Sequence, residues 1–181
     1  MEIPKVTIKH AEFIIVPALI VFGVMLRLLP HEPNVAPVGA IALFGGAVFG
    51  WRAAIGLPLG ILILSDLVIG MYPGIQYTWI GFLLVAIFGM ALRKVAFLPR
   101  VAAGAFGSAA IFFVVSNAGV WLAGGLYPHT IAGLEHCYAA AIPFFRPTLL
   151  GDGLYGSVLF GAYALALRWA DARCSAPANV R

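Results

Sequence analysis

Two long apolar stretches without a charged side chain constrain this chain more than any other feature. They run from Leu67 to Leu92 and from Val101 to Leu134. Hydrophobic residues make up 62% of the 181 positions and charged residues only 10%, whereas soluble chains have about 45–50% and about 25%. Lipid is therefore the expected surrounding. Spans in lipid must be helices or closed barrels, and long unbroken apolar runs indicate helices.

A helix that crosses the hydrocarbon core needs roughly 20 residues, and the apolar runs divide the chain into about six such elements. The predicted fold class is an all-α membrane protein, a bundle forming a single domain over residues 1–172 with a loose tail at 173–181. The expected transmembrane helices cover about 12–29, 38–50, 53–71, 75–92, 101–124 and 147–169. Pro73-Gly74 is expected to form a turn, Arg93–Arg100 a basic loop, and Leu126–Arg146 a longer loop before the last span.

The second element, Val38–Gly50, is short for a span. Its thirteen residues rise only about 20 Å at the helical pitch, so a re-entrant hairpin stays open as an alternative. Small residues spaced four apart let helix backbones approach closely, and this spacing occurs at Ala42, Gly46 and Gly50, and again at Gly153, Ser157 and Gly161. The composition thus favours burial of the second element among other helices.

The distribution of positive charge predicts the orientation. With the N-terminus in the cytoplasm and six alternating spans, nine of the eleven Lys and Arg residues fall inside, and only Arg27 and Arg146 fall outside. Cytoplasmic loops carry the positive excess, so both termini are expected inside. The basic residues flank apolar runs and form no stripe interleaved with aromatic residues, so the expected partner is the lipid bilayer and not nucleic acid.

In this topology the unusual polar residues gather toward the outer face. Ionisable residues within membrane segments are costly and usually face a bundle interior or a cavity. Asp66 and Asp152 are therefore the most informative carboxylates, and Arg27 and Arg146 are their expected counter-charges. Two interpretations stay open and are compatible: the pairs lock helix ends together, or they frame a ligand pocket.

The remaining candidates point less clearly to chemistry. An interfacial aromatic belt is expected for Tyr72, Tyr77, Trp79 and Tyr127. His129 and His136 are seven positions apart, too far for an i, i+4 metal pair, so no metal site is expected even with Cys137 nearby. The sequence has no His-Glu-x-x-His, no Gly-x-Ser-x-Gly and no phosphate-binding loop, so neither enzymatic activity, nor a cofactor, nor an ATPase is expected.

Three strings resemble a family of uncharacterised small bacterial inner-membrane proteins. They are RLLPHEPNVAPVGAIALFGGA (Arg27–Ala47), LSDLVIG (Leu64–Gly70) and NAGVWLAGGLYPHTIAGLEHCYAAAIPFFRPTLLGD (Asn117–Asp152). The size and the six-span plan are also similar to the substrate-binding S components of energy-coupling-factor (ECF) vitamin transporters. The first span departs from that pattern, since it lacks the Ala-x-x-x-Ala repeat with which S components dock on their transmembrane partner.

The resemblance implies a multi-pass protein of the bacterial inner membrane that captures a small polar nutrient, such as a vitamin or cofactor precursor, near the outer face. It implies ligand contacts from Arg27, His31, Asn34, Asp66, Asn117, Trp121, Tyr127, Cys137, Tyr138, Arg146 and Asp152. An ECF-type module with an ATPase would be the energy-supplying partner. The alternative is an accessory subunit of a larger membrane complex, with no ligand of its own.

Overall fold

The computed structural model describes residues 5–30, 32 and 34–175, and the elements it defines over this range are all helical. These elements are α1 (Lys5–Leu28), α2 (Val38–Val48), α3 (Trp51–Ile69), α4 (Ile75–Ala91), the short 3-10 helix η1 (Leu92–Lys94), α5 (Phe97–Ala123) and α6 (Ile131–Ser175). The prediction of an all-α bundle is confirmed.

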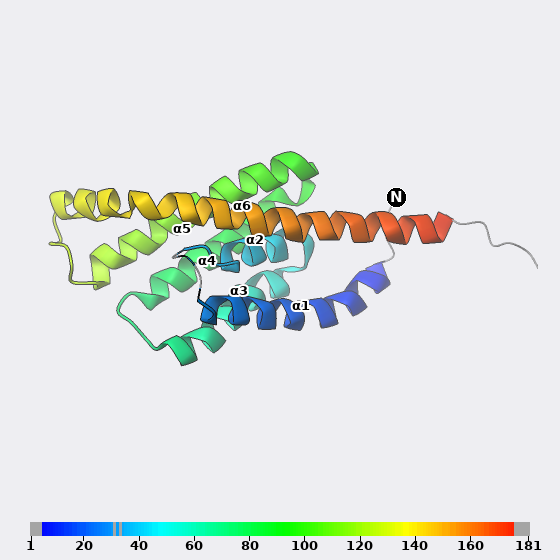
Figure 1. The fold of residues 1–181 in the computed structure, drawn as a ribbon, viewed down its shortest axis with the longest axis horizontal. Helices are drawn as coiled ribbons and strands as arrows, with labels where there is room; N and C mark the ends of the chain where they lie inside the picture. Colours follow the sequence, from blue (N-terminus) through cyan, green and yellow to red (C-terminus); the bar gives the residue numbers. More distant parts are fainter. Residues whose placement is uncertain (1–4, 31, 33, 176–181) are drawn as a thin grey trace, which may run out of the picture.

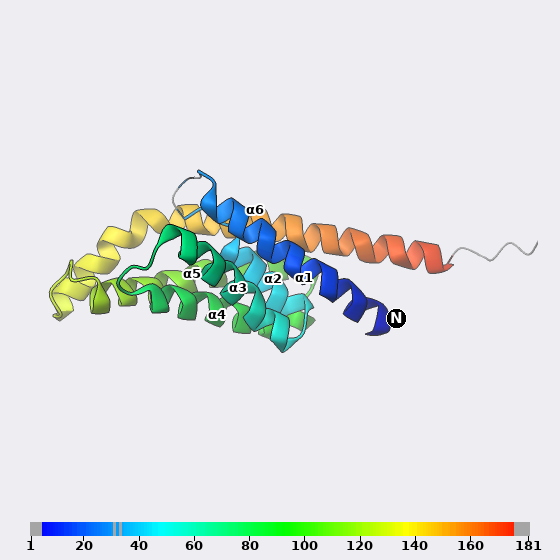
Figure 2. The same ribbon diagram turned by 90° about the horizontal axis from the view of Figure 1, so that it is seen from below.

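Successive α-helices run in opposite directions along the long axis of the bundle (Figures 1 and 2). The C-termini of α1, α3 and α5 therefore lie at one end, which we name the distal end, and the C-termini of α2 and α4 lie at the other. This is the alternation that the predicted topology requires.

The short helix α2 forms the centre of the bundle. It has 11 residues, its residues from Val38 to Ala47 are all buried, and it contacts each of the other five α-helices. Its small residues explain this close packing. A Cβ on Gly46 would lie 1.9 Å from the carbonyl oxygen of Ala86 in α4, and one on Gly89 would lie 2.3 Å from that of Leu43. The predicted burial of this element is confirmed.

The C-terminus of α2 is held by a cation from the linker after α4. Arg93 donates a hydrogen bond from Nε to the carbonyl of Gly46 at 2.9 Å and another from Nη2 to the carbonyl of Phe49. The last carbonyls of a helix have no partner within it, and the helix dipole favours a positive charge there. Arg93, which the sequence placed only in a basic loop, therefore fixes the C-terminal end of the central helix.

Within the residues whose side chains are described, four helical segments are long and apolar enough to cross a membrane: Trp51–Ile69, Ile75–Lys94, Phe97–Ala123 and Ile131–Ala172. The central α2 rises about 16 Å, roughly half of the hydrocarbon core of about 30 Å. It is too short to span this core alone, so the short second element is a buried half-length helix at the centre of the bundle.

The predicted loop Leu126–Arg146 and the predicted start of the last span at Pro147 are both wrong. The single helix α6 covers Ile131–Ser175, with Pro143 and Pro147 inside it, and it bends along its length (Figure 2). Proline removes one backbone donor and kinks a helix, but without competing water the helix continues through it. The last part of the predicted tail, residues 176–181, lies outside the described residues.

Candidate functional site

The N-terminus of α2 receives the carboxylate of Asp152 from α6. Asp152 is only 3% exposed, and its Oδ2 accepts a hydrogen bond from the Ser108 hydroxyl of α5 at 2.6 Å. The carboxylate also accepts the backbone N–H of Ala40, in the first turn of α2. Helix N-termini leave their first N–H groups unpaired and favour an anion. Asp152 thus supplies the cap that the N-cap residue Pro37 does not give.

Gly39 makes this close approach possible. A Cβ on Gly39 would lie 2.3 Å from Oδ1 and 2.9 Å from Cγ of Asp152, which is nearer than real side chains come to one another. The carboxylate therefore lies against the backbone of α2 itself, and its position is fixed by three helices.

Asp66 of α3 is the second buried carboxylate, at 1% exposure. Arg27 of α1 donates from Nη1 both to Oδ1 of Asp66 and to the hydroxyl of Ser65. The indole N–H of Trp79 in α4 donates to Oδ2 at 2.8 Å. This cluster joins α1, α3 and α4, and its carboxylate has both a counter-charge and a neutral donor.

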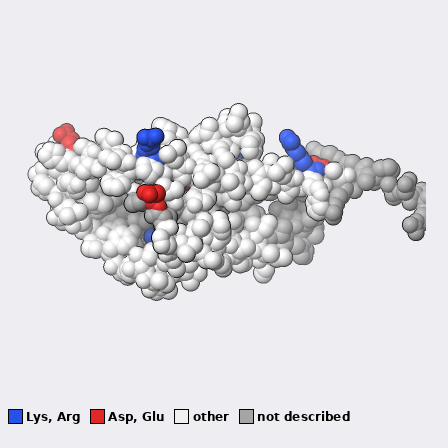
Figure 3. Space-filling model, in the orientation of Figure 1, with Lys and Arg blue, Asp and Glu red and all other residues white. Residues whose placement is uncertain are grey.

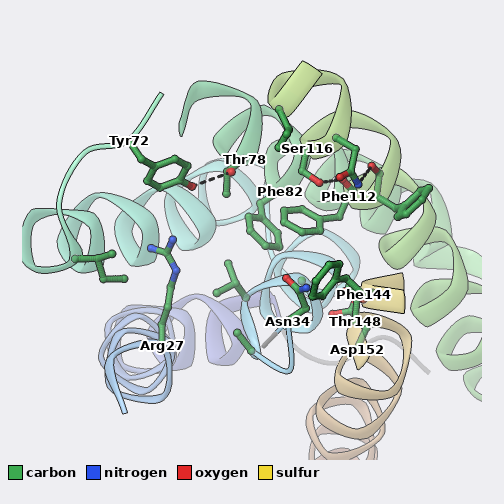
Figure 4. Close-up of a pocket in the computed structure, with 17 residues that line it drawn as sticks. Arg27, Asn34, Tyr72, Thr78, Phe82, Phe112, Ser116, Phe144, Thr148 and Asp152 are labelled. Carbon is green, nitrogen blue, oxygen red and sulfur yellow. Dashed lines mark hydrogen bonds between the residues drawn. The ribbon is translucent and has the colours of Figure 1, made fainter. Parts of the chain in front are cut away.

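A cavity of about 460 Å³ lies at the distal end, with Arg27 and Asp152 as its charged lining residues. Figure 4 shows Arg27 on one side of it and Asp152 with Thr148 on the other. The space-filling view shows a hollow at this end of a mostly uncharged surface (Figure 3). The other residues around the cavity are Asn34, Ala36, Val38, Gly39, Ile69, Tyr72, Thr78, Phe82, Phe112, Phe113, Ser116, Asn117, Val120, Phe144 and Thr148.

Aromatic rings form much of the wall. Phe82 of α4 stacks on Phe112 of α5 with ring centroids 4.5 Å apart and an interplanar angle of 23°. Tyr72 donates its hydroxyl proton to the Thr78 side chain at 2.9 Å (Figure 4). The cavity thus combines flat apolar surfaces with a few polar groups, which is typical of small-molecule sites.

The bent part of α6 supplies the third wall. Phe144, Thr148 and Asp152 are spaced four residues apart and therefore lie on one face of the helix, and all three line the cavity. Arg146 lies between them in sequence, points to another face and is exposed. The expected Arg146–Asp152 pair is therefore wrong: within the described part of the chain the one ion pair joins Arg27 to Asp66, and Ser108 takes the place predicted for Arg146.

Five of the predicted ligand residues belong to this site. Four of them line the cavity, namely Arg27, Asn34, Asn117 and Asp152, and Asp66 lies behind Arg27. Asn34 adopts a left-handed backbone conformation with φ of 63°, which Asn tolerates better than most residues. His31 lies outside the described residues.

Five other predicted ligand residues do not line the cavity: Trp121, Tyr127, Cys137, Tyr138 and Arg146. Three of them have structural hydrogen bonds to backbone carbonyls instead. Trp121 donates to Pro128 at 3.0 Å, Tyr138 to Val114 at 2.7 Å, and the Cys137 thiol to Asn117 at 3.4 Å. The bonds of Tyr138 and Cys137 hold the distal part of α6 against α5, because this segment is helix and not the predicted loop. The bond of Trp121 ties α5 to the linker before α6.

Two members of the expected aromatic belt contact the site. Trp79 of α4 binds the buried Asp66, so its indole N–H points inward, whereas a belt residue faces the membrane interface. Tyr72 lines the cavity and is also 39% exposed, so its position is compatible with the belt.

Residues missed by the sequence analysis are mostly ordinary apolar ones. The cavity wall includes Phe82, Phe112, Phe113 and Phe144, and a single sequence gives no signal that distinguishes a phenylalanine lining a cavity from one that contacts lipid. Thr148 could have been found, because it lies four residues before Asp152 and so shares its helical face.

Among the side chains that the structure describes, no group of three His, Cys, Asp or Glu residues is placed to hold a metal ion. The residues that line the cavity offer hydrogen bonding, charge and aromatic contact.

The part of the chain that the structure describes contains four helices of membrane-spanning length, and with a cavity at one end of the bundle this is the architecture of a helical membrane protein. The chain belongs to a family of unknown function (DUF6580), whose model matches residues 8–174, from α1 to α6. None of the curated proteins and none of the solved structures compared with the chain matches it.

Proposed function

We propose that this protein is a binding and uptake component for a small polar nutrient, such as a vitamin or cofactor precursor, captured in the distal cavity. The observation that carries the proposal is the convergence of polar side chains from α1, the α1–α2 linker, α5 and α6 on one aromatic-walled cavity. Polar groups in apolar segments are costly, and a structural network alone does not require a cavity beside them.

The size and the lining of the cavity fit this role. Small-molecule sites occupy about 300–1,000 Å³ and place a few polar groups in largely apolar walls, and the cavity has about 460 Å³. The Arg27–Asp66 pair provides a rigid frame on one side, while the Ser108–Asp152 contact provides one on the other. A preorganised site loses less entropy on binding.

The proposed setting is a bacterial inner membrane, with both termini in the cytoplasm and the distal end outside. The S components of ECF transporters are the proposed functional analogue. Capture at the distal end would be followed by reorientation or handover, with energy supplied by a partner because the sequence has no ATPase motif.

Native mass spectrometry of gently purified protein tests the proposal. We expect a stoichiometric small molecule, and we expect Arg27→Ala and Asp152→Ala to abolish its retention and uptake. Asn117→Ala and Thr148→Ala remove polar side chains of the cavity that donate hydrogen bonds only to carbonyls of their own helix. Both variants should therefore fold normally, and both should bind less ligand. Ser157→Ala removes a comparable exposed bond and is the matched control. Unchanged binding and uptake in folded Arg27, Asp66 and Asp152 alanine variants would refute the proposal.

The second candidate is an accessory subunit of a larger membrane complex. One observation favours it: the small residues of α2 pack inside the bundle, but Gly153, Ser157 and Gly161 on α6 remain exposed or partly exposed. Stable co-purification with the same protein partners, without any small molecule, would support this function in place of the first.

A further inference from the structure

We propose that the cavity takes an organic cation, an amine or amidine on an aromatic or other flat apolar body, with its positive group on Asp152. This inference rests on the proposed function and names the class of ligand. It follows from the charge of the lining, the position of the carboxylate and the nature of the walls.

The charge balance of the cavity favours a cation. Its two charged lining residues are Arg27 and Asp152, and the charge of Arg27 is balanced by its ion pair with Asp66. Asp152 has no basic side chain within ion-pair distance among the described residues. A ligand with a positive group would supply the missing counter-charge, and a ligand with a negative group would be repelled.

The carboxylate of Asp152 is also positioned to accept more hydrogen bonds. It accepts the Ser108 hydroxyl and the Ala40 N–H, and an ionised carboxylate has about four acceptor sites. Those two contacts and the backbone at Gly39 fix its orientation while it faces the cavity. A charge-assisted bond from an ammonium or amidinium group is among the stronger polar contacts in proteins.

The walls add a second, independent preference. Phe82 and Phe112 present a stacked pair of rings, and Tyr72, Phe113 and Phe144 also line the cavity. Aromatic faces carry negative quadrupole charge and attract cations within about 6 Å. They also stack on flat organic bodies. One ligand class satisfies both the carboxylate and the rings.

The competing interpretation is that Asp152 only caps α2. If Asp152 served only as a cap, it would do so in an empty cavity as well. This interpretation predicts no preference for charged over neutral ligands. The two interpretations therefore differ in a binding measurement and not in a stability measurement.

Three probes of similar size separate the two interpretations: benzylamine, benzyl alcohol and benzoate. Binding would be measured by saturation-transfer NMR with the full-length protein in maltoside micelles, because this detergent has neither an amine nor a charge that would itself attract a cation. We expect benzylamine to bind about tenfold more tightly than benzyl alcohol, the effect of one charge-assisted hydrogen bond, and benzoate to bind most weakly.

Asp152→Asn keeps the size and an acceptor oxygen but removes the charge. It should lower benzylamine affinity to that of benzyl alcohol and leave benzyl alcohol unchanged. Glu135→Gln removes an acidic charge from α6 outside this cavity and should change neither affinity. The comparison of the three probes on the unchanged protein stands even if the Asn variant fails to fold.

Each outcome decides the inference. Equal binding of the amine and the alcohol, or tighter binding of benzoate, would overturn the cation preference but leave a ligand-binding cavity in place. No binding of any probe would overturn the proposed function as well. The ammonium of a phosphatidylethanolamine headgroup has the same chemistry as a free amine. Displacement of benzylamine on adding that lipid to the micelles would identify the lipid as the source, and undisturbed binding would identify a free solute.

Discussion

The two buried carboxylates are held in opposite ways. Asp66 is paired with Arg27 and bound by Trp79 in a cluster of α1, α3 and α4. Asp152, equally buried, is bound by the Ser108 hydroxyl and a backbone N–H of α2, without a cation among the residues that the structure describes. The same residue type thus forms a closed ion pair on one side of the cavity and an open acceptor on the other.

This difference shows how a carboxylate that binds a ligand can be distinguished from one that only positions helices in a membrane bundle. A carboxylate with a full set of partners gains nothing from a ligand and serves to position helices. A carboxylate held only by neutral donors has remaining capacity, and it is this one that lines the cavity directly. The comparison can be tested by substituting each side separately.

The largest expected effect is the loss of stability caused by Asp66→Asn, which is compared with the smaller loss caused by Asp152→Asn. Asp66→Asn leaves Arg27 without its counter-charge, and breaking such a buried pair costs about 3–5 kcal/mol. Asp152→Asn leaves no unpaired cation and should cost only about 1–2 kcal/mol, the loss of charge on two hydrogen bonds. Thermal unfolding in nanodiscs measures both. Equal losses at the two positions would show that the clusters do not differ in this way.

Gly39→Ala should disturb only the Asp152 side. The added methyl would lie 2.3 Å from the carboxylate, and overpacking of this kind costs about 1–3 kcal/mol. Gly56→Ala is the matched control, because a Cβ there meets nothing within 4 Å and removing glycine from a helix interior stabilises it by about 0.5–1 kcal/mol. A lower unfolding temperature for Gly39→Ala and a higher one for Gly56→Ala are expected. The same sign for both would contradict the proposed contact.

The smallest effect is expected at the hydroxyl that holds Asp152. Ser108→Ala removes a buried donor to the carboxylate, which costs about 1–2 kcal/mol. Ser157→Ala removes a hydroxyl that bonds to its own helix and is exposed, and it should stay within about 0.5 kcal/mol. Chemical denaturation of the two variants in matched detergent gives the comparison, and a neutral Ser108→Ala would indicate that Asp152 is held by α2 alone.

Helix positions were readable from the sequence wherever apolar runs end in clear turn residues. The turn between α3 and α4 is such a case, since Gly70 and Gly74 have positive φ angles of 101° and 86° and the predicted boundaries differ from the observed ones by two residues or fewer. The long α6 was not readable, because Pro143 and Pro147 are strong breaking signals in water and weak ones in lipid.

The charged residues of the site could be predicted from the sequence, but the apolar residues that line the cavity could not. Arg27, Asp66 and Asp152 stand out because each is costly in an apolar segment. The predicted partner of Asp152 is wrong because the topology places Arg146 at the same outer face, while helical geometry puts Arg146 on another side of α6 and Ser108 comes from a different helix. Contacts between distant segments of this kind depend on packing, which a single sequence does not display.

The great length of α6 has a mechanical consequence. Its 45 residues extend about 68 Å, with the proline bend beside the cavity wall and the far end well beyond the rest of the bundle (Figure 1). No proline follows Pro147 within the helix, so the segment after the bend turns as one straight lever, and a change of angle too slight to resolve at Thr148 becomes a displacement of several ångströms at its far end. A spin label at the exposed Leu165 would therefore act as a pointer for events at the cavity.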